Sequence, residues 1–467
     1  MSKFYNSNKQ IIFMKIALLP TLIITTFLFL FVPAYAQRGQ IQYLRPYDFY
    51  GINQFETADT TSVQYEGLAL RLGANFTQGY QILLHSNSGK TELYSLSPGF
   101  PLAQANLNID VQLLDGIRLN LVSYLSTHHH NETWVKGGYV QIDKVEFLKS
   151  DFMNRIWNHL TLKVGHMEIN YGDAHFRRSD GGNTFWNPFI ENNIMDAFTT
   201  EIGGELYWQN KNIVVMGGIT NGEIQGSVTR ESDRGASVYG KIGYDKQFNN
   251  KIRGRITASI LDKRSSINGT LYGGDRTGSN YQYVMEPINA TLTGNAFSGR
   301  VNPNFKDNLT AVMINPFLKI GGFELFGTFE ISKGNTAVEN GEIQYADSSQ
   351  STEVFKKLDD RQFVQSEVDV VYRFCKQEKL YVGAKYNYLT GKQVFGTSTA
   401  LTPGGISQGS RATISVDRIS FAAGWFITNN ILIKGEYVIQ EYNNFPQNNL
   451  LHQGNFNGFV FQGSIAF

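Results

Sequence analysis

The segment Asn457-Gly-Phe-Val-Phe-Gln-Gly-Ser-Ile-Ala-Phe467 alternates between two kinds of side chain. Phe459, Phe461 and Ile465 share one parity, and small or polar residues such as Gln462 share the other. Successive side chains of a β-strand point to opposite faces of the sheet. The period of two therefore predicts a strand with one apolar face and one mainly polar face.

Alternating segments of this kind recur along the chain, with polar turns between them. Most have about the ~10 residues that a tilted strand needs to cross a bilayer. The predicted strands are 68–85, 103–113, 117–126, 134–145, 159–170, 200–209, 212–221, 236–247, 251–262, 309–320, 322–333, 362–374, 379–389, 412–426, 430–441 and 457–467. The sequence therefore predicts an all-β fold of about sixteen strands.

The connections between these strands alternate between short and long. The short ones are 114–116, 209–211, 248–251, 321, 375–378 and 427–430. The long ones are 171–199, 222–235, 263–308, 334–361, 390–411 and 442–456. Outer-membrane β-barrels have short periplasmic turns and longer extracellular loops. Because lipid offers no hydrogen-bond partners, a sheet in a membrane must close and leave no edge. We therefore expect a closed antiparallel transmembrane β-barrel.

Closure places one parity of each strand in lipid and the other in the lumen. In 430–441, Ile431 and Ile433 are expected to face lipid, while Lys434 and Glu436 face the lumen. The segment 159–170 changes phase part of the way along, so we expect a β-bulge near Gly165 and His166.

The N-terminal residues have the form of a secretory signal. Lysines precede an apolar run from Ile16 to Val32, and an Ala-x-Ala cleavage site ends at Ala36. An uncleaved anchor helix is the alternative, and the start at Met1 or Met14 stays open. The predicted domains are a signal peptide (1–36), a short periplasmic or lumenal N-terminal segment (37–66) and an outer-membrane barrel (67–467).

Charge and composition exclude several classes of protein. The chain has 41 basic and 40 acidic residues. Removal of three lysines with the signal leaves 38 bases against 40 acids, so a nucleic-acid partner is not expected. Cys375 is the single cysteine, which excludes an internal disulfide. Adjacent histidines at 128–130 point to opposite sides of an extended segment, a poor geometry for a metal. We expect no metal, no cofactor and no enzymatic activity.

The predicted lumen is polar and carries charges of both signs. A sixteen-strand barrel is wide enough for an aqueous channel. These charges either hydrate a pore wall or create a transverse field that orients polar solutes. The predicted lumen-lining residues are Arg253, Arg255, Glu367, Asp369, Arg373, Lys385, Arg418, Lys434 and Glu436.

The long connection 171–199 is the best candidate for a functional site. It combines many charged residues with the apolar Phe185, Trp186 and Phe189. A purely exposed loop has little reason to carry so many aromatic residues, so we expect it to fold into the barrel. The alternative is an outer loop that caps the rim. The predicted pore constriction consists of Asp173, His175, Arg177, Arg178 and Asp180.

Two runs, His129–Asp143 and Val164–Asp180, resemble porin-type outer-membrane proteins of Bacteroidota. The layout is also distantly similar to the phosphate-selective porins, which have sixteen strands. Those porins carry an arginine–lysine ladder along the lumen, and the mixed charges of this chain depart from it. Phosphate selectivity is therefore not implied. The resemblance does imply a homotrimer and recognition of Phe467 by the barrel-assembly machinery.

These observations predict an outer-membrane porin for passive diffusion of small hydrophilic solutes. Its expected location is the bacterial outer membrane, and its expected partners are membrane lipid and small polar solutes. One alternative is a plugged-barrel transporter for a hydrophobic substrate. Another is a binding or adhesion barrel that uses the surface loops 263–308 and 334–361.

Overall fold

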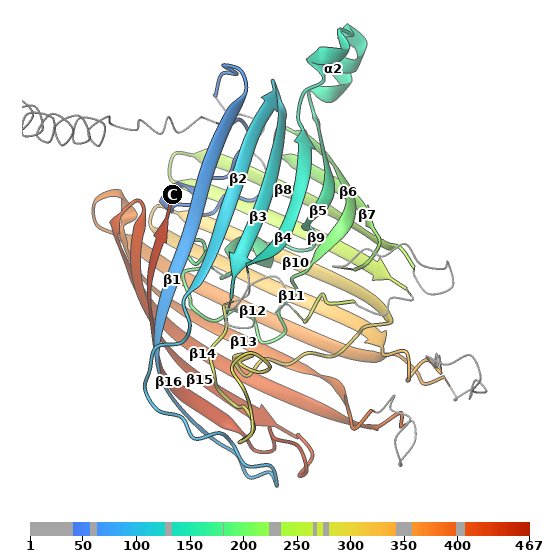
Figure 1. Ribbon diagram of the computed structural model, residues 1–467, viewed down its shortest axis with the longest axis vertical. Coiled ribbons are helices and arrows are strands. Elements are labelled where there is room, and N and C mark those ends of the chain that lie inside the picture. The colour runs from blue at the N-terminus through green and yellow to red at the C-terminus, as the bar shows by residue number, and fades with distance from the viewer. Residues whose placement is uncertain are drawn as a thin grey trace, which may run out of the picture. The chain divides into compact units, whose positions relative to one another are not determined.

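The computed structural model describes residues 41–56, 63–126, 133–180, 182–223, 235–264, 269–273, 280–341, 357–397 and 407–467. Within them, sixteen antiparallel strands form one closed barrel (Figure 1). Each strand pairs with its neighbours in sequence, and β1 (Ala69–Ser86) pairs with β16 (Asn455–Ala466). The predicted fold class is confirmed. The signal-peptide residues and His128–His130 lie outside the described residues.

The strand bounds follow the predicted segments, but some ends are longer and others shorter than predicted. β13 (Leu380–Phe395) continues beyond the predicted end at residue 389, whereas β4 (Trp134–Ile142) stops short of residue 145. The remaining strands are β2 (Gln104–Leu114), β3 (Ile117–Leu125), β4 (Trp134–Ile142), β5 (Leu160–Glu168), β6 (Thr200–Asn210), β7 (Ile213–Thr220), β8 (Ser237–Asn249), β9 (Ile252–Lys263), β10 (Asn308–Ile320), β11 (Phe323–Asn335), β12 (Arg361–Phe374), β13 (Leu380–Phe395), β14 (Ser410–Thr428) and β15 (Ile431–Asn443).

The barrel has apolar side chains outside and polar side chains inside. In β15, Ile433 is 49% exposed, whereas Lys434 and Glu436 are each 1% exposed. A water-soluble sheet would bury the isoleucine and expose the charges. The exposed apolar parity recurs along other strands, for example at Ile256 and Val368. This arrangement suits a sheet whose outer solvent is lipid.

The seam between β1 and β16 closes the sheet over a long register. Phe76 pairs with Ile465, and both side chains are large and exposed on the outer face. Phe461 is exposed on the same face. The backbones of Ala74 and Phe467 exchange two hydrogen bonds of 3.0 Å. β16 therefore has no free edge on either side, because β15 pairs with it as well.

The predicted bulge near Gly165 and His166 is wrong. β5 pairs with both β4 and β6 through these residues without a shift in register. The irregularity lies in the backbone of Gly165, whose φ of 147° is open to glycine and unfavourable for other residues. The register shift in this region lies in the β3–β4 pair instead, between Val122 and Ser123.

The short connections lie at one end of the barrel and the long loops at the other. The β4–β5 connection is the longest at the periplasmic end because it holds helix α2 (Asp151–Trp157), which begins at the N-cap Ser150 (Figure 1). Short 3-10 helices are η1 (Phe49–Gly51), η3 (Glu146–Leu148), η4 (Ala174–Arg177) and η7 (Lys376–Glu378). Among the described residues, no helix is long and apolar enough to span a membrane.

Candidate functional site in the barrel lumen

Three chain segments occupy the lumen. They are the N-terminal segment (41–56), the inner loop (169–199, described except at residue 181) and part of the second loop (280–305). In the second loop, the carbonyl oxygens of Ser298 and Gly299 accept hydrogen bonds from Arg418 and Gln440 of the wall. The inner loop is deeply buried, with Phe185 at 1% and Ile194 at 0% exposure. Its two ends meet, since the amide of Ile169 donates to the carbonyl of Thr199 at 3.3 Å. The inner loop is therefore a closed excursion from the wall into the barrel.

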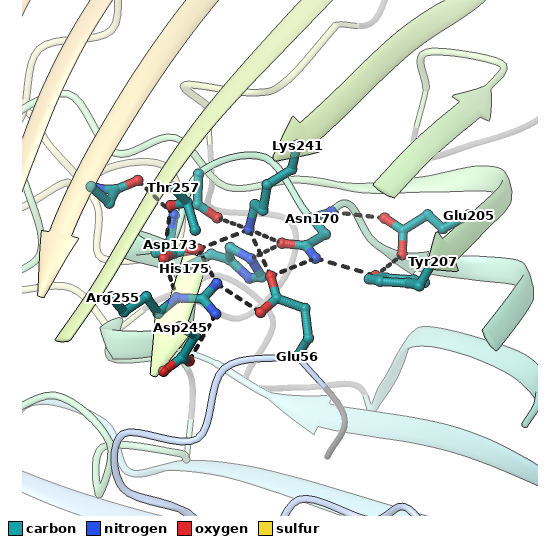
Figure 2. Close-up of polar contacts among 12 residues, drawn as sticks. Glu56, Asn170, Asp173, His175, Glu205, Tyr207, Lys241, Asp245, Arg255 and Thr257 are labelled. Carbon is teal, nitrogen blue, oxygen red and sulfur yellow. Dashed lines mark hydrogen bonds and ion pairs between the residues drawn. The ribbon is translucent and has the colours of Figure 1, made fainter. Parts of the chain in front are cut away.

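The first anchor of the inner loop is the carboxylate of Asp173 (Figure 2). It accepts hydrogen bonds from Lys241 Nζ at 2.9 Å, Arg255 Nε at 2.8 Å and Thr257 Oγ1 at 2.9 Å, all on β8 and β9. Glu56 joins the same cluster through Arg255 Nη2 at 2.7 Å. The Asp173 side chain is fully buried. The cluster thus ties both the inner loop and the N-terminal segment to one part of the wall.

The charges of this cluster stabilise one another. Burial alone raises the pKa of Glu56, but Arg255 and Lys241 outweigh it and lower the pKa to about 2. The same two cations overcome the burial of Asp173 and hold its pKa below the usual range of an aspartate. Opposite charges at hydrogen-bond distance favour the ionised form of a carboxyl group. Both carboxylates therefore stay ionised in neutral and mildly acidic solution.

The opposite part of the wall holds the backbone of the inner loop. Lys434 Nζ donates to the carbonyl oxygens of Thr184 at 2.9 Å, Asn187 at 2.9 Å and Phe189 at 2.6 Å. An ammonium group has three donors, so the three carbonyls satisfy all of them. A lysine that would be costly to bury alone is thereby accommodated in the lumen.

Further along the inner loop the same pattern continues. Lys385 Nζ donates to the carbonyl of Glu191 at 2.6 Å, and Arg418 Nη1 donates to that of Asn192 at 2.5 Å. The carboxylate of Glu436 accepts the amide of Glu191 at 3.1 Å. These wall residues belong to the predicted lumen-lining set, and here they contact protein backbone.

The aromatic part of the inner loop packs against apolar residues of the wall. Phe185 and Phe189 form a buried cluster with Tyr381, Phe426 and other side chains. The rings of Phe185 and Phe426 lie 5.7 Å apart. Burial of large rings stabilises the loop inside the barrel.

All nine predicted lumen-lining residues lie on the inner face of the wall. Eight are buried, and Arg253 is the exception, with its side chain 25% exposed. Some pair within the wall, as Arg373 does with Glu324 at 2.9 Å. Their part in solute passage stays a prediction.

Three of the five predicted constriction residues lie in buried ion pairs. Asp173 belongs to the anchor described above. Arg177 Nη2 lies 3.0 Å from Asp369 on the wall, and Arg178 Nη2 lies 2.8 Å from Asp196 within the inner loop. These contacts fix the path of the loop, and the role of the three residues in narrowing the pore stays a prediction.

The other two constriction residues, His175 and Asp180, border a cavity. His175 Nδ1 lies 2.6 Å from Glu168, and Asp180 forms an ion pair with Lys136. The cavity has a volume of about 210 Å³. It lies between the inner loop, the N-terminal segment and the wall formed by β1 to β6. It is the main candidate site for a solute in the described part of the lumen.

The N-terminal segment makes contacts that the sequence analysis did not anticipate. The guanidinium of Arg45 lies 3.5 Å from the centre of the Trp186 ring. Asn53 Nδ2 donates to Glu324 Oε1 at 2.7 Å, across 271 residues of sequence. The sequence does indicate that this segment is buried, because it is rich in aromatic residues such as Tyr47 and Phe49. Such residues favour burial over a solvated linker.

The loop carboxyl of Glu191 gives a testable pH dependence. Burial, with a smaller contribution from Glu436, raises its pKa to about 7. The nearby cations Arg418 and Lys385 oppose this rise and do not cancel it. A raised pKa means that the folded protein favours the protonated form. The stabilising contribution is therefore complete below about pH 4.5 and is lost as the pH rises towards 7.

We expect the free energy of unfolding of the wild type to contain a component, at most about 3 kcal/mol, that falls between pH 4.5 and 8. Glu191→Gln should remove this component because the amide does not titrate. Guanidinium unfolding of both proteins in detergent at several pH values measures the difference. Identical pH profiles would refute the assignment.

No protein-family model matches the chain, and no curated protein matches it. Among solved structures, the outer membrane channel DcaP of Acinetobacter baumannii is 10% identical, with a TM-score of 0.47 over 87% of this chain and 100% of that chain. An anion-selective porin from Comamonas acidovorans is 9% identical, with a TM-score of 0.47 over 86% and 100%. OprB of Pseudomonas putida is 11% identical, with a TM-score of 0.46 over 86% and 94%. Similarity this low carries no argument about function.

The location follows from the barrel itself. A closed sheet of sixteen strands, with exposed apolar residues outside and charged residues buried inside, is built for a lipid surround. Closed antiparallel barrels of this kind span the outer membranes of bacteria. The protein is a β-barrel protein of the bacterial outer membrane.

Proposed function

We propose that the protein is a porin that lets small hydrophilic solutes diffuse passively across the outer membrane. In this proposal the inner loop narrows the lumen, and solutes pass on the side of β1 to β6. The observation that carries it is the placement of the cavity. The inner loop is fastened to β8 and β9 by Asp173 and to β13–β15 by its backbone, and the cavity lies on the remaining wall.

The lining of the cavity favours a polar solute over a hydrophobic one. It contains the charged Arg118, Lys136 and Lys163 and several asparagines. A hydrophobic substrate would leave the Nε and Nη1 donors of Arg118 without hydrogen-bond partners, which is costly. We therefore favour the porin over a plugged-barrel transporter for a hydrophobic substrate. Selectivity would come from the width and charges of the passage, without catalysis.

Electrical recording in planar lipid bilayers tests the proposal. We expect the purified protein to insert and to give a steady, ohmic conductance, because a polar lumen holds water and ions. The reversal potential in a salt gradient then reports ion preference. Heat-denatured protein is the control. A folded barrel that inserts but carries no current would contradict the proposal.

Assembly partners remain part of the same proposal. We expect a homotrimer, and we expect the assembly machinery to recognise the final strand through Phe467. Analytical ultracentrifugation in detergent tests the first expectation. Loss of membrane insertion on removal of Phe467 tests the second.

A further inference from the structure

Among the described residues, three cations that line the cavity have no carboxylate within ion-pair distance: Arg45, Arg118 and Lys163. Arg45 donates to the carbonyl oxygens of Gly51 and Phe176, both at 2.9 Å. Arg118, 4% exposed, donates Nη2 to Gln141 Oε1 at 2.7 Å and to the Tyr139 hydroxyl at 3.3 Å. Its Nε and Nη1 have no hydrogen-bond partner. Lys163 reaches the Tyr207 hydroxyl at 3.4 Å and lies over the Tyr139 and Tyr207 rings. In the described ranges, no carboxylate oxygen lies within 4.0 Å of a side-chain nitrogen of Arg118 or Lys163.

The carboxylates that border the same cavity already have partners. The three pairs are Glu56 with Arg255, Glu168 with His175 and Asp180 with Lys136. The charges of Glu56 and Asp180 are compensated by cations, whereas Glu168 contacts a histidine. None of the three carboxylates lies within ion-pair distance of Arg118 or Lys163. Asp143 interacts with both cations at longer range, but it does not line the cavity. The cavity surface on the β3–β5 side therefore presents cations with no carboxylate in contact, and such a surface attracts an anion.

The cavity also presents buried acceptors and a donor without partners. Asn106 and Asn183 are each 5% exposed, and the Oδ1 atom of each has no hydrogen-bond partner. The indole Nε1 of Trp186 is likewise unpartnered. Buried polar groups are nearly always hydrogen-bonded, so groups left over at a cavity indicate what its occupant supplies. Amide oxygens require donors such as hydroxyl groups, and the indole requires an acceptor.

We propose that this cavity is a binding site for a small polyhydroxylated carboxylate, a solute of the sugar-acid class. The carboxylate binds near Arg118 and Lys163, and the hydroxyl groups donate hydrogen bonds to the Oδ1 atoms of Asn106 and Asn183. The sugar ring packs against aromatic residues such as Tyr139. One water molecule needs about 10–15 Å³ of free space. The cavity of about 210 Å³ therefore has room for a monosaccharide-sized solute.

Neither half of this chemistry is sufficient alone. Inorganic phosphate would satisfy the cations and leave the asparagine oxygens and the rings unused. A neutral sugar would satisfy the asparagines and leave Arg118 without an anion. The inference rests on the proposed passage of small polar solutes and names the class that the cavity retains.

Isothermal titration calorimetry of the folded protein in detergent tests the site with three probes. We expect D-galacturonate to bind about tenfold more tightly than D-galactose, because the carboxylate adds a charge-assisted hydrogen bond. Inorganic phosphate should also bind about tenfold more weakly than D-galacturonate. Equal binding of galacturonate and galactose would overturn the proposal, as would equal binding of galacturonate and phosphate.

Charge-removing variants locate the binding. Lys163→Gln and Arg118→Gln should each weaken galacturonate binding about tenfold and leave galactose binding unchanged. Lys376→Gln is the matched control, because Lys376 is exposed in the short η7 turn. Lys163 is only partly buried, so its variant keeps the test valid if Arg118→Gln fails to fold. Full galacturonate binding by folded Lys163→Gln would overturn the proposal.

Bilayer recording separates this inference from the proposed function. If the protein conducts but galacturonate does not bind, the porin proposal stands and the sugar-acid site is wrong. If galacturonate binds but the barrel carries no current, the site stands and passive diffusion is wrong.

Discussion

Removal of most of the inner loop should raise the single-channel conductance several-fold. The variant replaces residues 174–196 with a short glycine–serine linker, which is feasible because Ile169 and Thr199 are hydrogen-bonded to each other. It retains Asp173, so Lys241 and Arg255 keep their buried partner. The wall charges that held the loop would be hydrated, and the cross-section open to ions would increase.

A deletion of residues 147–157 is the control for this experiment. These residues include α2 and lie in a connection at the periplasmic end, away from the inner loop's anchors. Planar-bilayer recording should give wild-type conductance for this control. If the loop deletion also leaves the conductance unchanged, the inner loop does not limit the passage.

Asp173→Ala should destabilise the protein by about 3–5 kcal/mol in its free energy of unfolding, the usual cost of breaking a buried ion pair. The substitution leaves Lys241 with Glu56 as its carboxylate partner, and Arg255 with Glu56 and Asp245. Guanidinium unfolding in detergent measures the loss. The freed loop should also become accessible to trypsin at Arg177.

Asp262→Ala provides the matched control. Asp262 pairs with Arg264 on the surface, where the two side chains are 40% and 79% exposed. Exposed ion pairs contribute about 0–1 kcal/mol, so this variant should unfold nearly as the wild type does. Similar stability of the two variants would show that the Asp173 cluster does not anchor the loop.

The fold could be predicted from sequence because the membrane imposes a simple periodic rule. Residues such as Ile433 and Lys434 alternate because one must face lipid and the next must face the lumen. The rule acts on each strand separately, so the count and the order of the strands follow without knowledge of distant contacts. It failed near Gly165, because Met167 and Ile169 are apolar residues buried inside the barrel. The apolar residues therefore change parity along the sequence although the strand keeps its register.

The interior of the barrel could be predicted only in part. Phe185 and Trp186 indicate that the inner loop is buried, but no local sequence pattern predicts which residues it contacts. The contact of Asn53 with Glu324 spans 271 residues, and that of Arg45 with Trp186 also joins distant segments. Such contacts depend on where the chain enters the lumen, which a period of two does not encode.

Three wall cations donate hydrogen bonds to backbone carbonyl oxygens of the inner loop: Lys385, Arg418 and Lys434. Every residue type carries this carbonyl group. These contacts hold the backbone path of the loop whatever side chains the contacted residues carry. Side chains that point towards the passage can be exchanged while the same three cations continue to hold the loop. The same barrel could therefore hold inner loops of different sequence, provided that their backbone follows the same path. Grafting such loops offers a direct way to engineer selectivity.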